Sequence, residues 1–369
     1  MYAWSLRTLS RRLSFFEIKY SDYDVDVNEL KEVVKTEMEG PGNLLGYRAL
    51  QQKIREVHGL NVPRDLVYAM MMEVNPEGLK ERGGVGKPKR ARRDKVFTSH
   101  GSDWTMSLDG HDKLCGYQNS MFPLSIYGGQ DTYSGRINFL KIWTTNSNPK
   151  VIGKFYLEYL FESKVLPVHL RIDRGTETDV MATMQMFLCD KYNVLEDPND
   201  SVLYGPSTQN KIERWWRELL ERLERFFKQQ LKNLAEDGDY DSTSMTDRNL
   251  LAYVYIPVVQ KELDIFRTTI WNNHRVRRQK NKELPTGVPE HMYHCPEEHG
   301  GEKCGISITE EDLLEVAQLS DVLIDTDDFL EENFRNECMR HIPNTDEIKP
   351  ADAANAYLFL RSNFNKDCL

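Results

Sequence analysis

The 369-residue sequence has no run of 18 apolar residues, and its six cysteines include no CxxC pair. The missing apolar run excludes a membrane-spanning helix from the expected elements. The scattered cysteines argue against a disulfide framework and for a reducing compartment. The first residues, MYAWSLRTLSRRLSFF, have neither a long apolar core nor a small-residue cleavage site. This argues against a secretory signal and leaves a mitochondrial presequence open.

Charge is distributed unevenly along the chain. The net charge of −10 is unfavourable for nucleic-acid binding, but residues 306–349 alone hold 13 acidic and three basic residues. The rest of the chain is therefore close to neutral and carries two basic clusters, KPKRARRDK and HRVRRQKNK. The side chains expected to lie along nucleic-acid phosphates are Lys87, Lys89, Arg90, Arg92 and Arg93 in the first cluster and Arg275, Arg277 and Arg278 in the second.

The acidic segment predicts either a surface for a protein partner or a part that masks the chain's own basic regions. The first basic cluster is equally consistent with a solvated tether or a nuclear-import patch. We therefore expect a nuclear protein, or a cytoplasmic one that enters the nucleus.

Periodicity and glycine or proline breaks predict the domain organisation. Helix, short turn and helix in the N-terminal region match a helix-turn-helix layout, with residues 64–74 as the reading helix. The same composition fits any small three-helix domain. The predicted divisions are a helical region at 1–80, a basic linker at 81–100, an α/β core at 101–235, a helical extension with a basic segment at 236–305 and an acidic helical region at 306–369.

The core is predicted to follow the order β-β-β-α-β-α-β-α. Three antiparallel strands then lead into an alternating parallel part. This order predicts an α/β protein with a ribonuclease H-like core, in which helices flank a mixed five-stranded sheet.

Three carboxylates fall at related places in this predicted core. SLDG ends one strand at Asp109, LRIDRG ends another at Asp173, and Glu213 lies in the first turn of the helix after the last strand. Strand carboxyl ends and helix starts meet at one edge of an α/β sheet. Three like charges there are unfavourable unless a cation neutralises them. Carboxylate oxygens are the ligands that Mg²⁺ prefers, so the three residues predict a magnesium site.

The helix that carries Glu213 is predicted to begin near Thr208, after good N-cap residues. Its apolar side chains recur at helical spacing and form one stripe. We interpret Trp215 and Trp216 in that stripe as core residues that hold the helix in place, rather than as base-stacking platforms. Gln209 and Lys211 precede Glu213 and are either DNA contacts or plain solvent-facing residues.

Other acidic residues compete for the same role. Asp103, Asp112 and Asp131 lie near Asp109 in the sequence, and a hairpin-turn role explains Asp131 better. Glu177 is either a helix-start acid or a group supporting the site, and we favour the helix start.

The segment HMYHCPEEHGGEKC holds five residues that can ligate zinc, namely His291, His294, Cys295, His299 and Cys304. Their spacing matches no standard zinc pattern, so a polar loop is the simpler interpretation. The sequence alone leaves zinc binding at residues 291–304 open.

Several motifs together resemble a known family. SLDG, IDRGTETD and STQNKIERWW resemble the three parts of a DDE integrase or transposase core, and the chain resembles the eukaryotic integrase core domain proteins related to retroviral and transposon integrases. The matching segments, from about residue 40 to 293, are GPGNLLGYRALQQKIREVHGLNVPRDLVY, SLDGHDKLCGY, IYGGQDTYSGRI, NSNPKVIGKFYLEYL, IDRGTETDVMATMQ, YGPSTQNKIERWW and WNNHRVRRQKNKELPTGVPEHMY.

The resemblance implies a catalytic and metal-binding triad of Asp109, Asp173 and Glu213. It implies two Mg²⁺ or Mn²⁺ ions bridged by Asp109, DNA end processing and strand transfer, and a homo-oligomer on two DNA ends. The gap from Asp173 to Glu213 is longer than in retroviral proteins, so we expect an insertion near residues 190–201.

Other functions remain open from the sequence. The first is a domesticated, catalytically silent DNA-binding protein that keeps the integrase fold, although the intact triad argues against it. The second is a nuclease acting on RNA–DNA hybrids. The third is a scaffold whose acidic segment binds a protein while the core stays inert.

Overall fold

The structure is a computed structural model that describes residues 4–18, 21–76, 99–116, 120–205, 211–276, 284–323 and 328–365. It divides the chain into two compact units, Met1–Arg90 and Ala91–Leu369. Within the described residues, no helix combines the length and the apolar character that a membrane crossing requires.

The N-terminal unit consists of helices. They are α1 (Leu6–Phe15), α2 (Val27–Glu39), α3 (Tyr47–His58) and α4 (Arg64–Val74). Helices α2, α3 and α4 bury apolar side chains at helical spacing, among them Leu30, Leu50 and Met71, while α1 buries none. Lys53 is buried as well, and its Nζ lies 3.0 Å from Glu37 Oε2. Two helices joined by a short turn, α3 and α4, are present, and their assignment as a DNA-binding helix-turn-helix stays a prediction.

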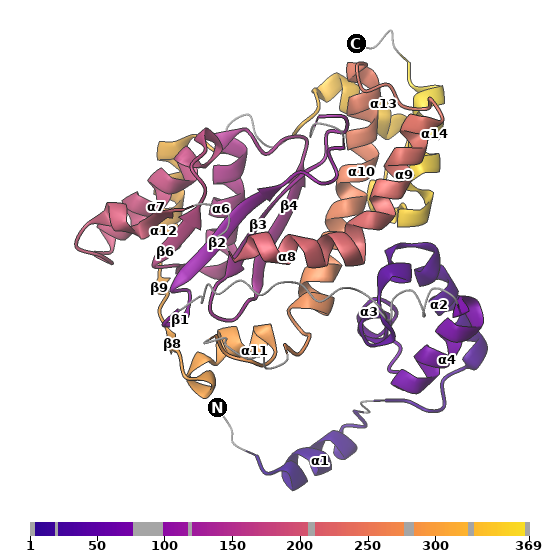
Figure 1. Cartoon of the computed structure of the whole chain (residues 1–369), viewed down its shortest axis with the longest axis horizontal. Coiled ribbons are helices and arrows are strands. Elements are labelled where there is room, and N and C mark those ends of the chain that lie inside the picture. The colour runs from indigo at the N-terminus through magenta and orange to yellow at the C-terminus, as the bar shows by residue number, and fades with distance from the viewer. Residues whose placement is uncertain are drawn as a thin grey trace, which may run out of the picture. The chain divides into compact units, whose positions relative to one another are not determined.

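The second unit is built on a mixed five-stranded sheet (Figure 1). Its strands are β2 (Thr105–His111), β3 (Ser125–Asp131), β4 (Ile137–Trp143), β6 (His169–Ile172) and β7 (Val202–Tyr204), in the spatial order β4-β3-β2-β6-β7. The first three pair antiparallel, and β6 pairs parallel with both β2 and β7. The predicted fold class is confirmed, and three antiparallel strands lead into a parallel part along the chain, as expected.

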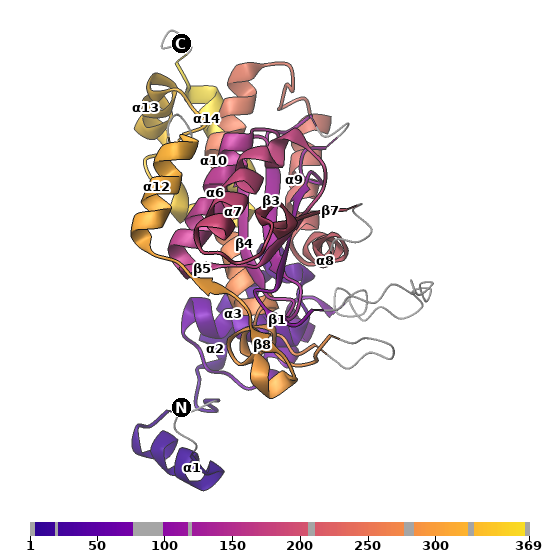
Figure 2. The same cartoon turned by 90° about the vertical axis from the view of Figure 1, so that its left-hand side faces the viewer.

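Helices cover both faces of this sheet (Figure 2). On one side, α6 (Pro149–Ser163) and α7 (Asp179–Lys191) pack on the main apolar core, which includes Met106 and Leu108 of β2. On the other side lies α8 (Ile212–Leu219). Because side chains alternate along a strand, Asp109 and His111 of β2 lie on the face opposite Met106 and Leu108, which is the face that α8 covers.

The acidic C-terminal segment packs on the same unit. Helix α12 (Glu310–Ser320) adds Leu313 and Val316 to the main core, and Lys191 Nζ lies 2.5 Å from Asp312 Oδ1. Two further helices, α13 (Glu332–His341) and α14 (Ala353–Asn363), follow. Part of the negative charge of this segment is thus paired within the chain.

The stretch VLPVHLRID, which leads to Asp173, is apolar enough for one buried strand but is divided at Pro167. Its first part, β5 (Val165–Leu166), pairs with β9 (Ile306–Ser307) instead of joining the main sheet. Proline has no N–H to donate to a ladder, which explains the break. A second small pair joins β1 (Gly101–Ser102) to β8 (Glu302–Lys303).

The outer edge of the sheet, strand β4, is covered by α10 (Met245–Ile265) and the π-helical turn η7 (Phe266–Trp271). Gln260 of α10 accepts a hydrogen bond from Ile142 N and donates one to Leu140 O, each 3.0 Å long. At the start of the strand, the side chain of Asn272 accepts a hydrogen bond from Ile137 N and donates one to Ile137 O. Side-chain amides therefore form the hydrogen bonds that a neighbouring strand would otherwise make with the backbone of β4, so these edge groups are not left unpaired.

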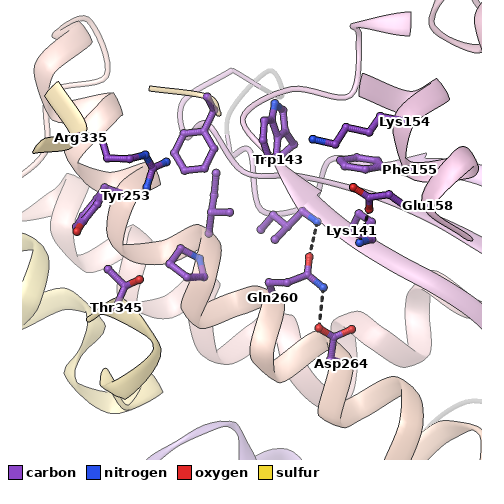
Figure 3. A pocket seen from close by; sticks show the side chains of 14 residues that line it. Lys141, Trp143, Lys154, Phe155, Glu158, Tyr253, Gln260, Asp264, Arg335 and Thr345 are labelled. Atoms are coloured by element: carbon purple, nitrogen blue, oxygen red, sulfur yellow. Dashed lines mark hydrogen bonds and ion pairs between the residues drawn. The ribbon is translucent and has the colours of Figure 1, made fainter. Parts of the chain in front are cut away.

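Figure 3 shows the Gln260 amide between β4 and Asp264, at the wall of a pocket of about 330 Å³. Aromatic side chains, including Trp143 and Phe155, line this pocket together with the ion pair of Lys141 and Glu158.

Replacing Gln260 with leucine should destabilise the fold. The change leaves Leu140 O and Ile142 N without partners at a covered edge, at a cost of about 1–3 kcal/mol for each group. Urea unfolding followed by circular dichroism measures the difference from the wild type. The control is Gln229→Leu, an exposed glutamine of the neighbouring helix, which should change stability by less than about 0.5 kcal/mol. Equal effects of the two changes would contradict the edge role.

Candidate active site

The register between β2 and β6 brings the first two carboxylates together. The parallel ladder pairs Thr105 with His169 and Ser107 with Arg171. Extended by two residues, the same register sets Asp109 opposite Asp173. The sequence predicted that the first strand ends at Asp109, but β2 continues to His111, because antiparallel pairing with β3 persists after the parallel pairing has ended.

Glu213 belongs to helix α8, which lies on the face of the sheet opposite α6 and α7, and its carboxylate lies close to those of the two aspartates. It is the second residue of α8, and its side chain is exposed. One carboxylate oxygen from each of Asp109, Asp173 and Glu213 lies within 4.8 Å of the other two. The expected helix start near Thr208 lies outside the described residues, and the described helix begins at Ile212.

Trp216 connects α8 to the first carboxylate. Its indole Nε1 donates a 2.9 Å hydrogen bond to Asp109 Oδ2. The side chain is buried, as the core interpretation predicted, but the sequence did not indicate its hydrogen bond. Gly128 makes room for this contact, because a Cβ there would lie 3.0 Å from Trp216 Cη2 and 2.7 Å from a methyl group of Leu140. The indole therefore fixes one oxygen of Asp109.

A second buried contact, made by His111, holds the Trp216 indole in place. The His111 ring stacks on the indole with centroids 4.6 Å apart, and His111 Nε2 lies 3.1 Å from Glu224 Oε2. Glu224 ends a π-helical segment, η6 (Leu220–Glu224), that joins α8 to α9 (Arg225–Glu236). A π-helical segment turns less per residue than an α-helix.

This slower rotation explains why the sequence missed Glu224. At α-helical spacing it would lie outside the apolar stripe, yet it is 1% exposed. Conversely Phe226, whose α-helical spacing from Trp215, Leu219 and Leu223 would place it in the apolar stripe, is only partly buried.

The electrostatics of the carboxylate cluster favour a bound cation. Burial raises the pKa of Asp109 to about 8, the charges of Glu213 and Asp173 add to the effect, and the Trp216 N–H opposes it. Burial also raises the pKa of Asp173, as do the neighbouring charges of Glu213 and Glu177. Asp173 Oδ1 is a buried oxygen with no hydrogen-bond partner among the described residues. Clustered carboxylate oxygens, one of them unpaired, fit Mg²⁺ or Mn²⁺.

Glu177, the predicted helix-start acid, lies in η3 (Thr176–Thr178), one turn before α7. It is near enough to raise the pKa of Asp173, although it does not belong to the three-residue cluster. Asp112 accepts a 2.7 Å hydrogen bond from Asn146 and is also outside the cluster.

The predicted DNA contacts are only partly described. Arg275 is exposed, and the Lys211 ammonium donates to Thr132 O in the adjacent hairpin. Contact of either residue with DNA stays a prediction. The remaining predicted contacts lie outside the described residues; they are Lys87, Lys89, Arg90, Arg92, Arg93, Gln209, Arg277 and Arg278.

Asp103 and Asp131 form a separate buried pair. Asp131 ends β3 and accepts hydrogen bonds from the Ser134 N–H and hydroxyl, as the turn interpretation predicted. It also accepts one from the Asp103 N–H, and the Asp103 carboxyl accepts one from the Tyr293 hydroxyl. Burial, aided by the Asp131 charge, raises the pKa of Asp103 to about 7.

Replacing Trp216 with phenylalanine should weaken Mn²⁺ binding by about 10–100-fold, because partners that orient a ligand contribute that much to metal affinity. The change removes the hydrogen bond to Asp109 and keeps an aromatic ring against His111. Isothermal titration calorimetry measures the affinity. The matched control is Trp215→Phe, since Trp215 Nε1 is buried without a hydrogen-bond partner in the described structure. If both variants lost Mn²⁺ affinity equally, the positioning role of Trp216 would be wrong.

Replacing Asp103 with asparagine should change how stability depends on pH. An unfolded aspartate titrates near pH 4, so between about pH 4 and 7 the folded chain holds a proton that the unfolded chain has released. The unfolding free energy of the wild type therefore falls as pH rises through this window. Relative to the wild type, Asp103→Asn should gain on the order of 1 kcal/mol per pH unit.

Urea unfolding at several pH values tests this expectation, with Asp190→Asn, a change at an exposed aspartate, as the control. A constant difference between Asp103→Asn and the wild type from pH 4 to 7 would show that Asp103 is ionised throughout.

One comparison with known proteins identifies the family of this core. A family model described as "Integrase core domain" matches residues 97–294, more than half of the chain. A comparison with curated proteins gave no match. The matched region contains the whole five-stranded sheet, α8 and the three clustered carboxylates. The chain belongs to the integrase core domain family.

Proposed function

We propose that this protein catalyses metal-dependent DNA strand cleavage and strand transfer through Asp109, Asp173 and Glu213. The observation that carries the proposal is the convergence of three carboxylates from two strands and one helix, with oxygens within 4.8 Å of one another. Family membership supports the reaction class, because integrase core domains belong to proteins that act on nucleic acid.

The three carboxylates would hold Mg²⁺ or Mn²⁺, with room in the donor set for two ions. Bound divalent ions would activate a water or a 3′-hydroxyl as nucleophile and stabilise the leaving oxygen. In the reaction, the oxygen of the nucleophile forms a bond to a DNA phosphorus while the bond from that phosphorus to a 3′ oxygen breaks. Hydrolysis of this kind frees a 3′ end, and attack by that end joins it to a second DNA.

The chain's own contacts would position the three carboxylates. Trp216 holds one oxygen of Asp109, and the parallel register sets Asp173 beside it. Glu213 comes from an exposed helix start, so DNA can approach the cluster from that side. Preorganised side chains of this kind lower the reorganisation needed at the moment of reaction.

Further parts of the proposal concern partners. DNA would contact the basic clusters, Arg275 among them, and the N-terminal helices α3 and α4 would add a helix-turn-helix-type contact. Strand transfer on two DNA ends calls for a homo-oligomer, and such a protein would act in the nucleus. The acidic region at 306–369, in which α12 carries four acidic residues and no basic one, would offer a surface to a protein partner.

Incubation with supercoiled plasmid and Mn²⁺, and then Mg²⁺, should produce nicked or joined DNA. Asp109→Asn and Glu213→Gln should each lower the rate by at least about 100-fold, because each removes a negative metal ligand. Gel electrophoresis of the products measures the rate. The matched controls are Asp112→Asn, next to Asp109 in sequence, and Glu218→Gln, which pairs with Arg222 on the same helix as Glu213.

Three other results are informative. DNA binding without metal, and with no cleavage by any variant, would favour a domesticated, catalytically silent DNA-binding protein. Cleavage of an RNA–DNA hybrid but not of plasmid would favour a ribonuclease H-type nuclease. Cleavage that survives in Asp109→Asn and Glu213→Gln would assign the activity to other residues or to a contaminant.

A further inference from the structure

A second group of metal-ligating side chains lies after the integrase core, where α11 (Pro289–His294) passes into the short helix η8 (Pro296–His299). His291, Cys295 and Glu298 each place a ligand atom within 4.8 Å of the other two. The backbone explains this closeness: Cys295 N donates to His291 O, and Glu298 N donates to Cys295 O. Two consecutive turns therefore stack the three side chains at one place.

The imidazole of His291 has a separate partner at each nitrogen. Its Nε2 lies 3.5 Å from Glu298 Oε2, and its Nδ1 lies 2.9 Å from His299 Nε2. The two nitrogens of one ring cannot face the same ion. A histidine that binds a metal through one nitrogen almost always donates its other N–H to a nearby acceptor, which fixes the tautomer. His299 is placed to be that acceptor.

The fold separates these residues from the other zinc candidates in the sequence. His294 Nε2 lies 2.9 Å from Glu290 Oε1, and Cys304 Sγ contacts Glu302 O at 3.6 Å. Neither belongs to the cluster. Glu298 does belong to the cluster, although its position in the sequence does not indicate a ligand.

Contacts with the rest of the unit hold this segment in place. Arg136 Nε donates a 2.8 Å hydrogen bond to Glu290, and the Tyr293 hydroxyl donates to Asp103. Tyr133 also donates to the main-chain oxygen of Pro296, between the two helical turns. The ligand-bearing backbone is thus fixed before any ion binds, which reduces the entropy that binding must overcome.

We propose that His291, Cys295 and Glu298 bind one Zn²⁺ ion, with a fourth position open to water and with His299 as the positioning residue. Imidazole, thiolate and carboxylate together suit zinc, whereas Mg²⁺ prefers oxygen ligands alone. Binding would convert the Cys295 thiol to a thiolate and release its proton to solvent. The site rests on its own side chains and does not depend on the proposed DNA chemistry.

Zinc binding to the full chain is measured by competition with a chromophoric chelator, in excess Mg²⁺ to saturate the carboxylate cluster. We expect one Zn²⁺ per chain. His291→Ala and Cys295→Ser should each weaken it by about tenfold or more, and His299→Ala by about 10–100-fold. The matched controls, His294→Ala and Cys304→Ser, should bind as the wild type does.

Two measurements on the wild type keep the test decisive even if a ligand variant misfolds. Co²⁺ in place of Zn²⁺ should give a thiolate-to-cobalt charge-transfer band, and Zn²⁺ should slow alkylation of Cys295 but not of Cys304. The proposal is overturned if no Zn²⁺ binds, if the controls weaken binding as much as the ligand variants, or if Co²⁺ shows no thiolate band.

Discussion

Burial of carboxylates that lie close together at the end of the β2–β6 ladder is the constraint on which the geometry of the candidate site depends. Asp109 and Asp173 are adjacent because of the strand register, and α8 adds Glu213 to them. Burial raises the pKa of Asp109, so the folded chain without a cation holds this group at a free-energy cost. The contacts around the cluster, with the Trp216–Asp109 hydrogen bond first among them, keep the oxygens together despite that cost. A protein shaped only for stability would separate these charges.

The rest of the unit makes this arrangement rigid. One face of the sheet packs on α6 and α7, and α12 packs on these two helices, so β2 cannot slide without exposing its core side chains. At the outer edge, amides of Gln260 and Asn272 pair with β4 as a neighbouring strand would. Behind Trp216, the buried His111–Glu224 contact limits movement of α8. These contacts hold β2, β4 and α8, and together they fix the geometry of the carboxylate cluster.

Sequence alone predicted the strand order, the sheet and the three clustered carboxylates, because these follow from periodicities of two and 3.6 residues and from acids at strand ends. It did not predict Glu224, because a π-helical segment changes the phase of the helix. Nor could periodicity show that Trp216 donates to Asp109, since that requires knowing which strand faces the indole. Glu298 could not be selected for a similar reason: the second of two glutamates after Pro296 is ordinary until the fold brings it close to a histidine and a cysteine. A local sequence pattern does not report the tertiary contacts that these three residues make.

The two ligand clusters differ in donor chemistry, and this difference has a physical consequence. Asp109, Asp173 and Glu213 offer only oxygen, whereas the cluster at α11 and η8 offers nitrogen, sulfur and oxygen. First-row metals such as zinc bind most nitrogen and sulfur sites more tightly than magnesium does. An oxygen-only cluster can therefore select Mg²⁺ or Mn²⁺ by hardness and abundance, while a mixed cluster retains zinc. The Tyr293–Asp103 hydrogen bond anchors the mixed cluster to the loop before β2, the strand that carries Asp109. Metal bound at α11 would thus stiffen the segment that leads into β2.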